Sequence, residues 1–184
     1  MRMEFYFVTS NKNKLREAQK ILNRRLKAIN LEIPEMQAVD VVDVVQDKAK
    51  RAYEKVKKPL IVEDTGLYIK AWRGFPGALI KWLLWHRGND GICKMLENEA
   101  DKSAYAQAAI CLYDGKRYKN FIGRVDGSIV LRPRGKSDFG WDPIFKPNGH
   151  NKTFAEMSGK EKDSISHRDR AFRKLKKYLD ANRS

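Results

Sequence analysis

The sequence predicts a mixed α/β fold, and two observations lead to that prediction. Short apolar and β-branched runs alternate with segments whose apolar residues recur at helical spacing. Asp114-Gly115, a dipeptide typical of tight turns, separates two strand-like runs and so indicates a β-hairpin. The 184 residues are 42% apolar and 33% charged, as in an ordinary globular domain. We therefore expect one domain over 1–184.

The first half of the chain begins with a strand, a polar loop and a helix. Aromatic and β-branched residues favour the strand, and apolar residues at helical spacing favour the helix. Pro34 ends the next strand because proline has no N–H to donate. In order, the predicted elements are a strand over 4–8, a loop over 9–14, a helix carrying Leu15, Ala18, Leu22 and Leu26, a strand over 29–33, alternation that becomes helical over 41–56, and a buried strand over 60–62 that runs into 63–66 and is followed by 67–72.

Glycine and proline punctuate the second half of the chain. Thr153-x-x-Glu156 and Ser158-x-x-Glu161 fit capping boxes, so two helical turns are expected to follow one another there. A long loop-rich stretch begins beyond Val130, and such stretches in a compact domain are usually functional. The other predicted elements are a loop over 74–77, short helices over 79–85 and 91–97, hairpin strands over 104–113 and 116–125, and a final amphipathic helix with Phe172, Leu175 and Leu179 on one face.

The charge balance is the unusual bulk property of the chain. Lysine and arginine exceed aspartate and glutamate by a net charge of +15. Such an excess attracts nucleic acid, steers a small polyanion such as a nucleotide toward a cationic cleft, or reflects solvated helix faces of a heat-adapted protein. Aromatic residues do not interleave with the basic clusters as on a single-strand stacking platform, so no stable nucleic-acid complex is expected.

Composition and pattern also predict where the protein works. No apolar run approaches the ~20 residues of a membrane-spanning helix, so no membrane partner is expected. The start of the chain lacks the pattern of a signal peptide. Cys93 and Cys111 have no metal-ligand spacing and form at most one pair. A reducing, cytoplasmic location is the simplest expectation.

The usual cofactor signatures are missing from the sequence. It contains no dinucleotide-binding glycine motif, no phosphate-binding loop that ends in Gly-Lys-Ser/Thr, no zinc protease motif and no nucleophile elbow. With only 3 histidines, a multi-histidine metal site is not expected. Chemistry in this chain must come from carboxylates, lysines and the backbone.

Two polar segments that follow strands are the first candidates for chemistry. The loop over 9–14 brings hydroxyls, amides and cations to the start of a helix, where free N–H groups favour a phosphate; a capped helix with solvated lysines is the alternative. Glu63 and Asp64 follow an apolar strand, where open α/β sheets place their sites; a surface turn is the alternative. Alternation along a strand turns only one of the two acids toward a given face, so we expect one to work and the other to be structural.

Two later segments supply aromatic surface and hydrogen-bond donors. In 138–143, aromatic rings bracket a glycine, and such a face stacks on a nucleobase unless it is a buried turn. The segment 162–168 places several donors for carbonyl and phosphate oxygens at a helix junction; a solvated basic face is the alternative. The candidate residues here are Phe139, Gly140, Trp141, Asp142, Lys162, His167 and Arg168.

These motifs follow one another in a fixed order over most of the chain. They are Thr9-Ser10-Asn11-x-x-Lys14 with Glu17, Pro34-Glu35, Glu63-Asp64-Thr65-Gly66-Leu67, Gly74-Phe75-Pro76-Gly77 with Lys81-Trp82, Phe139-Gly140-Trp141-Asp142-Pro143-Ile144-Phe145, Ala155-Glu156-Met157, Glu161-Lys162 and Ser166-His167-Arg168. In order and spacing the set resembles the inosine triphosphate pyrophosphatase family, also called Ham1-like. Ser10 stands where many members carry Gly, and Trp141 where Tyr is common.

The resemblance implies a fold, a reaction and a set of site residues. The fold is an elongated central mixed β-sheet flanked by helices, with a cleft between two lobes, commonly in a homodimer. The reaction is hydrolysis of ITP, dITP and XTP to the monophosphate and pyrophosphate with Mg²⁺, which cleanses the nucleotide pool. Glu35 and Asp64 would hold the metal, and Asp64 would be catalytic as ligand, general base or both. The implied substrate-binding residues are Thr9, Ser10, Asn11, Lys12, Asn13, Lys14, Lys48, Thr65, Lys81, Phe139, Gly140, Trp141, Asp142, Lys162, His167 and Arg168.

Two alternatives remain open from the sequence. A basic nucleic-acid-binding protein would use the charge and leave the acidic motif structural. A Maf-like pyrophosphatase for modified nucleotides fits the fold but lacks support from 139–142 and 166–168. For the favoured reaction, donors from His167, Arg168 or nearby backbone N–H groups are expected to pair with the six-position oxygen of hypoxanthine or xanthine. ATP, which carries an amino donor there, should be a poor substrate.

Overall fold

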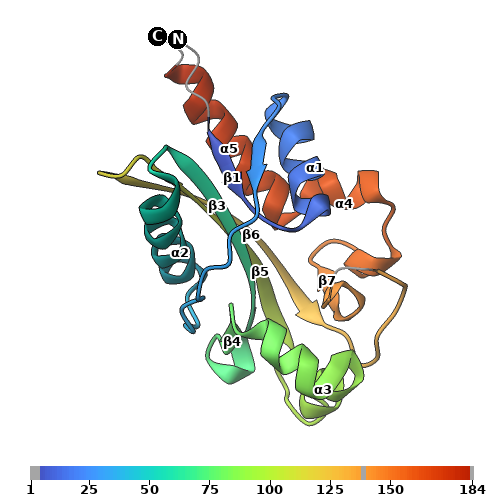
Figure 1. The fold of residues 1–184 in the computed structure, drawn as a ribbon. Helices are drawn as coiled ribbons and strands as arrows, with labels where there is room; N and C mark the ends of the chain where they lie inside the picture. The colour runs from blue at the N-terminus through green and yellow to red at the C-terminus, as the bar shows by residue number, and fades with distance from the viewer. Residues whose placement is uncertain (1–4, 138–139, 183–184) are drawn as a thin grey trace.

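A seven-stranded mixed sheet forms the centre of the protein (Figure 1). The computed structural model describes residues 5–137 and 140–182. The strands are β1 (Tyr6–Val8), β2 (Lys27–Ile29), β3 (Leu60–Ile69), β4 (Pro76–Gly77), β5 (Ser103–Tyr113), β6 (Tyr118–Ile129) and β7 (Phe145–Pro147). Their order is β2-β1-β3-β5-β6-β7, with β4 paired to β3. Strand β1 runs parallel to β2 and β3, and the other pairs are antiparallel, which confirms the mixed α/β prediction.

Helices cover both faces of this sheet (Figure 1). They are α1 (Lys12–Leu22), α2 (Val41–Val56), α3 (Ile80–Met95), α4 (Gly159–Ile165) and α5 (His167–Ala181), with 3₁₀ turns at Lys70–Trp72, Asp142–Ile144 and Phe154–Glu156. Ile61 packs in a buried cluster with residues of α1 and α5, whereas its neighbours Leu60 and Val62 pack with α2 on the other face. A third cluster joins α3 to the far end of the β5–β6 hairpin.

The early part of the chain differs from the sequence-based expectation in two places. Helix α1 ends at Leu22 because Asn23 adopts a left-handed conformation (φ 49°), so Leu26 lies outside the helix although it is buried. The predicted strand over 29–33 is wrong: β2 covers Lys27–Ile29. Parallel pairing with the three residues of β1 fixes that position, and Leu31 and Ile33 instead pack beside α2 and line a cleft.

Two further segments are more regular than their patterns suggested. The stretch 41–56 is helical throughout, because Asp40 caps it by accepting the N–H of Val42. The β5–β6 hairpin is longer than predicted, and its expected two-residue turn is wrong. Tyr113 pairs with Tyr118, so four residues, 114–117, connect the strands. The Asp114 side chain accepts N–H groups from Lys116 and Arg117 (both 2.8 Å), which stabilises this longer turn.

Most helical predictions for the second half are confirmed. The short helices over 79–85 and 91–97 appear as the two parts of α3, which breaks at Gly88 (φ 62°, ψ 178°). Both capping boxes are present, and Phe172, Leu175 and Leu179 are buried on one face of α5. Cys93 and Cys111 are buried free thiols. Among the described residues, no helix is long and apolar enough to cross a membrane.

Strand β3 runs unbroken through the acid pair, so the prediction that the strand ends before Glu63 is wrong. It pairs with β5 along its whole length. On its other edge, β1 reaches only Leu60 and Ile61, and β4 pairs with Leu67 and Tyr68. Between these pairings, no strand in the described part of the chain covers 63–66, and this short open edge faces a cleft.

Two glycines allow the close backbone approaches that shape this region. A Cβ on Gly66 would lie 2.8 Å from the carbonyl carbon of Gly77, so the bare backbone of β3 admits β4. A Cβ on Gly123 would lie 2.0 Å from the carbonyl oxygen of His167, so α5 begins directly on the surface of β6. The second approach brings the start of α5, with His167 and Arg168, to the level of the acid pair.

Candidate active site

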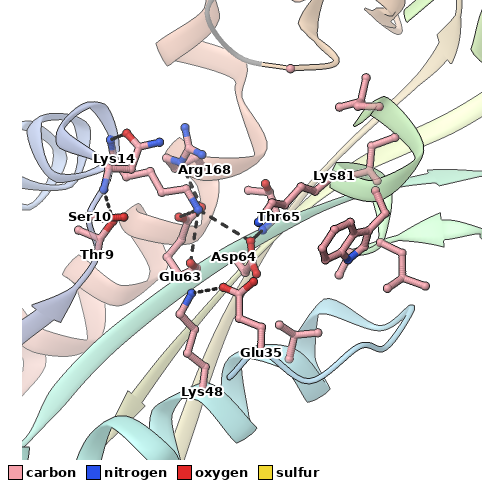
Figure 2. Close-up of a pocket in the computed structure, with 18 of the residues that line it drawn as sticks. Thr9, Ser10, Lys14, Glu35, Lys48, Glu63, Asp64, Thr65, Lys81 and Arg168 are labelled. Atoms are coloured by element: carbon pink, nitrogen blue, oxygen red, sulfur yellow. Dashed lines mark hydrogen bonds and ion pairs between the residues drawn. The ribbon is translucent and has the colours of Figure 1, made fainter. Parts of the chain in front are cut away.

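A cleft of about 770 Å³ opens beside the end of β1. Its walls come from the start of α1, the segment 30–38, α2, β3, α3, residues 140–142 and the junction of α4 and α5. Figure 2 shows side chains from these distant segments converging around Glu63 and Asp64. The predicted site residues that line it are Thr9, Ser10, Asn11, Lys14, Glu35, Lys48, Asp64, Thr65, Lys81, Gly140, Trp141, Asp142, Lys162, His167 and Arg168.

Two predicted site residues that the structure describes are not among those that line the cleft. Lys12 and Asn13 lie on the first turn of α1, outside the cleft lining. Lys14, on the same turn of the helix, does line the cleft. Phe139 lies outside the described residues.

The loop before α1 is held in one conformation by its own polar side chains. Thr9 Oγ1 accepts the N–H of Asn11 at 3.1 Å, and Asn11 Oδ1 accepts the N–H groups of Asn13 and Lys14 at 2.9 and 3.1 Å. Lys14 then extends from the first turn of the helix toward β3 (Figure 2). The loop thus presents a hydroxyl, an amide and one directed ammonium group at a helix start, which suits an anion.

The floor of the cleft is a buried chain of alternating charges. Glu63 Oε2 lies 2.8 Å from Lys14 Nζ, and Arg168 donates to Glu63 Oε1 at 3.1 Å. The guanidinium of Arg168 also donates to Glu17 on α1 at 2.9 Å. Burial alone would raise the pKa of Glu63, but the charges of Arg168 and Lys14 outweigh it and hold that pKa at about 2. Glu63 is therefore a fixed, fully compensated anion at neutral pH.

Asp64, the next residue of the same strand, has a different environment. Its side chain is 25% exposed, whereas that of Glu63 is 0% exposed. Asp64 Oδ1 accepts the N–H of Thr65 at 2.8 Å and lies 3.8 Å from Lys14 Nζ. This leaves carboxylate lone pairs open to the cleft, so the geometry separates a structural acid from an accessible one, as strand alternation predicts.

Glu35 and Lys48 form the opposite wall of the cleft (Figure 2). Glu35 belongs to the irregular segment before α2, and Lys48 on α2 donates to its Oε1 at 2.7 Å. Burial raises the pKa of Glu35, but the hydrogen bond and charge of Lys48, with the charge of Lys81, bring it below its usual value. Glu35 is thus an ionised, accessible carboxylate that faces the same space as Asp64.

The far end of the cleft is aromatic and more enclosed. Trp141 is only 8% exposed and packs against Phe145, Phe154 and His167, so most of its ring surface is already in the core. Only the small exposed part of the Trp141 ring is open to a nucleobase, and stacking there stays a prediction.

Two exposed tryptophans, Trp82 and Trp85, stack on each other at the cleft mouth and were missed as site residues.

The spacing of Trp82 and Trp85 in the sequence could have identified them as site residues. They stand three residues apart in a predicted helix, directly after Lys81, and this spacing puts them on one helical face. Met36 and Gln37, which follow Glu35, also line the cleft and were not predicted. No local pattern marks them, because their place depends on how the segment before α2 crosses the sheet edge.

Donors and acceptors at the enclosed end are mostly occupied. Asp142 is buried and accepts from Ser137 at 2.9 Å and from Lys162. His167 Nδ1 is buried and finds no hydrogen-bond partner in the described part of the chain. Burial, with the charges of Arg168 and Lys162, lowers the pKa of His167 well below its usual value. A neutral imidazole with an unused ring nitrogen thus lines the cleft, ready for a polar ligand group.

The carboxylates of the cleft suit a metal ion that shares its ligands with a substrate. Within 5–137 and 140–182, no three histidine, cysteine, aspartate or glutamate side chains gather as a protein-only metal site. Mg²⁺ prefers oxygen ligands and is commonly held by one or two carboxylates together with substrate phosphates and water. The donor set of Glu35 and Asp64, beside the loop over 9–14, fits that pattern.

The fold and site define an α/β protein whose cleft offers lysines and carboxylates to an anionic ligand. The sequence model of the Ham1 family matches residues 5–178. The chain is 44% identical over 178 residues to the inosine triphosphate pyrophosphatase of Aspergillus fumigatus, covering 95% of this chain and 93% of that one. It is 39% identical over 183 residues to the dITP/XTP pyrophosphatase of Thermococcus kodakarensis, covering 98% and 99%.

A solved structure agrees with these sequence matches. A HAM1 protein from Coxiella burnetii superimposes with a TM-score of 0.86 and 29% sequence identity, covering 97% of this chain and 99% of that one. The chain belongs to the Ham1 family. The predicted family resemblance is therefore confirmed.

Proposed function

We propose that the protein hydrolyses the non-canonical purine nucleoside triphosphates ITP, dITP and XTP to the monophosphate and pyrophosphate. The observation that carries the proposal is the convergence, in one cleft, of the loop over 9–14, the accessible Asp64 and the Glu35–Lys48 pair. The names of the Aspergillus and Thermococcus relatives, inosine triphosphate pyrophosphatase and dITP/XTP pyrophosphatase, support the same reaction.

The reaction assigns a part to each group in the cleft. Water adds to phosphorus, the bond to the pyrophosphate oxygen breaks, and the water proton needs an acceptor. Asp64, whose free lone pairs face the cleft, orients the water and accepts that proton. Thr9, Asn11 and Lys14 bind the triphosphate chain, and Lys81 adds a cation at the mouth.

The proposed cofactor is Mg²⁺, held by Glu35 and Asp64. When bound, it supplies charge stabilisation for the pyrophosphate leaving group. The same two carboxylates repel a bare triphosphate, so a counter-charge between them and the phosphates is required on electrostatic grounds. Measuring the metal dependence and the pH dependence of an Asp64→Asn variant distinguishes the role of metal ligand from that of general base.

Base selection is proposed to arise at the enclosed end of the cleft. His167 and the Lys162–Asp142 pair offer buried polar groups to the six position of the purine. Arg168 is bonded to Glu17 and Glu63, so its arrangement favours a positioning role through Glu63. Its direct contact with the base stays a prediction. A buried polar site that pairs with a six-position oxygen leaves an adenine amino group mismatched.

A substrate panel tests the proposal. We expect kcat/KM for ITP, dITP and XTP to exceed that for ATP by roughly 10²-fold or more, with pyrophosphate as the second product, since polar mismatches are rejected on the scale of about 10²- to 10⁴-fold. Equal rates on ATP would overturn the base assignment. No hydrolysis, combined with salt-sensitive binding of an oligonucleotide, would favour the nucleic-acid alternative instead.

Assembly and location belong to the same proposal. We infer a homodimer, as the family resemblance implies, in a reducing cytoplasm, the simplest expectation from the cysteine pattern. Exposed apolar side chains supply surface for a second copy; they include Phe75, Trp85, Met95 and Leu131. Light scattering coupled to size exclusion tests the association, and a monomer at micromolar concentration would contradict it.

A further inference from the structure

The two accessible carboxylates of the cleft differ in how an ammonium group compensates them. Lys48 Nζ lies 2.7 Å from Glu35 Oε1, whereas Lys14 Nζ lies 3.8 Å from Asp64 Oδ1 because Glu63 holds it at 2.8 Å. Lys14 is therefore anchored to a buried carboxylate, and its side chain, 18% exposed, still reaches the cleft. Lys48 is paired only with Glu35 among the ion pairs of the described residues.

The Glu35–Lys48 pair can exchange partners at small cost. The side chains of Glu35 and Lys48 are 38% and 20% exposed. Ion pairs this accessible stabilise a protein by only about 0 to 1 kcal/mol, because water and salt screen them. Lysine is also a point charge on a flexible four-carbon stem, so its ammonium can move to a nearby anion without a change in the backbone.

We propose that Lys48 is a resident counter-ion of Glu35, which occupies the place of the divalent cation in the free protein and moves to the triphosphate when the metal-loaded nucleotide binds. The inference rests on the proposed function, since it takes a triphosphate and a divalent cation as the ligands. Lys48 is thereby a specificity-determining residue that favours the metal-loaded nucleotide over either component alone.

The physical basis of this preference is an exchange of charges. A divalent cation that enters alone must separate Lys48 from Glu35, and the two positive charges then repel one another across a few ångströms. A triphosphate that enters alone meets the carboxylates of Glu35 and Asp64. When both enter together, Glu35 binds the cation and Lys48 gains a phosphate oxygen. The binding of each ligand therefore strengthens the binding of the other by the same factor.

The test is a titration of the nucleotide-free protein with Mn²⁺, followed by the electron paramagnetic resonance signal of the free ion. Lys48→Met removes the charge and keeps an unbranched side chain of similar length. We expect this variant to bind Mn²⁺ roughly fivefold or more tightly than the wild type, the usual lower range of coupling between sites. Lys48→Arg, which keeps the charge, should retain the weak wild-type affinity.

A matched control and a double variant complete the experiment. Lys50→Met removes an exposed lysine from the same helix outside the cleft lining and should leave Mn²⁺ affinity unchanged. Adding Glu35→Gln to Lys48→Met should abolish the gain, because the gained affinity belongs to Glu35. Unchanged or weaker Mn²⁺ binding by Lys48→Met, or a gain that survives Glu35→Gln, would overturn the inference. If Lys48→Met does not fold, Lys48→Gln is measured instead.

This outcome is distinguishable from failure of the proposed function. Hydrolysis of ITP by the wild type, with no change in Mn²⁺ affinity for Lys48→Met, leaves the proposed function standing and overturns the counter-ion role. Absence of hydrolysis on the whole nucleotide panel, with a Glu35-dependent gain in Mn²⁺ affinity, supports the counter-ion role and overturns the choice of reaction. Nucleotide binding without metal, measured in EDTA, should weaken in Lys48→Met because the phosphate loses a cation.

Discussion

The cleft contains two ion-paired carboxylates with different roles: Glu63 on the floor and Glu35 on the opposite wall, which we call the rim. On the floor, Glu63 is completely buried and bonded to both Lys14 and Arg168. On the rim, Glu35 is 38% exposed and bonded to Lys48. Breaking a buried ion pair leaves an uncompensated charge away from water, whereas breaking an exposed pair lets water take the place of the partner. Burial therefore decides which carboxylate is scaffold and which is free to change partners.

We expect the largest change in stability when the floor carboxylate, Glu63, is removed. Glu63→Ala removes the buried carboxylate that Lys14 and Arg168 share, so we expect the free energy of unfolding to fall by roughly 3 to 5 kcal/mol in a urea titration. Asp64→Ala, one residue along the same strand and partly exposed, should cost about 1 kcal/mol or less. Equal losses in the two variants would show that burial does not distinguish the floor from its neighbour.

The pH dependence of stability sharpens the same contrast. The pKa of Glu63 is about 2 in the folded protein against an ordinary value of 4.5, so its contribution is fully present above pH 4.5 and disappears as the pH falls toward 2. By the usual conversion this amounts to roughly 3 kcal/mol. Urea unfolding between pH 5 and 2 should therefore be steeper in pH for the wild type than for Glu63→Gln. Parallel curves would contradict the assignment.

Activity, in contrast, should depend on the accessible acid. Asp64→Asn keeps the shape of the side chain and an oxygen for the N–H of Thr65, but it removes the charge. We expect kcat/KM for ITP to fall roughly 10²-fold or more with little change in stability, the scale on which a general base acts. Asp47→Asn, on α2 outside the cleft lining, serves as the control and should retain full activity. Near-normal turnover by a folded Asp64→Asn would move the chemistry to Glu35.

The smallest expected effect lies at the mouth of the cleft. Lys81 is exposed and lies over the ring of Trp82, so its attraction for a polyanion is screened by salt. Lys81→Met should raise KM for ITP by roughly twofold to fivefold at low ionic strength, and the difference should vanish near 0.5 M salt, where the screening length is about 4 Å. Lys94→Met, at the other end of α3, should change nothing. A defect that persists in high salt would place Lys81 in direct, desolvated contact.

The sequence predicted the local features of the protein better than the contacts between distant segments that build the cleft. Local patterns sufficed for both capping boxes, the existence of the β5–β6 hairpin and the apolar strand that leads to Glu63. They also predicted that one acid of the pair would be structural. Each of these features depends on residues within a few positions of one another, so the signal is present in the sequence itself.

Long-range pairing accounts for what the sequence did not predict. Arg168 meets Glu63 across 105 positions of the chain, and Lys48 meets Glu35 only because α2 crosses beside the segment before it. The continuation of β3 past the acid pair depends on β5, which pairs with every residue from Leu60 to Ile69. No local pattern records such partners, and the strand over 29–33 was misplaced for the same reason: its position depends on β1.

The most direct test of the central claim is the identity of the products from ITP. Wild-type protein incubated with ITP and Mg²⁺ is followed by phosphorus nuclear magnetic resonance, which separates pyrophosphate from orthophosphate. The proposed reaction predicts IMP and pyrophosphate in equal amounts, with no orthophosphate formed in step with them. Release of IDP and orthophosphate would contradict the account.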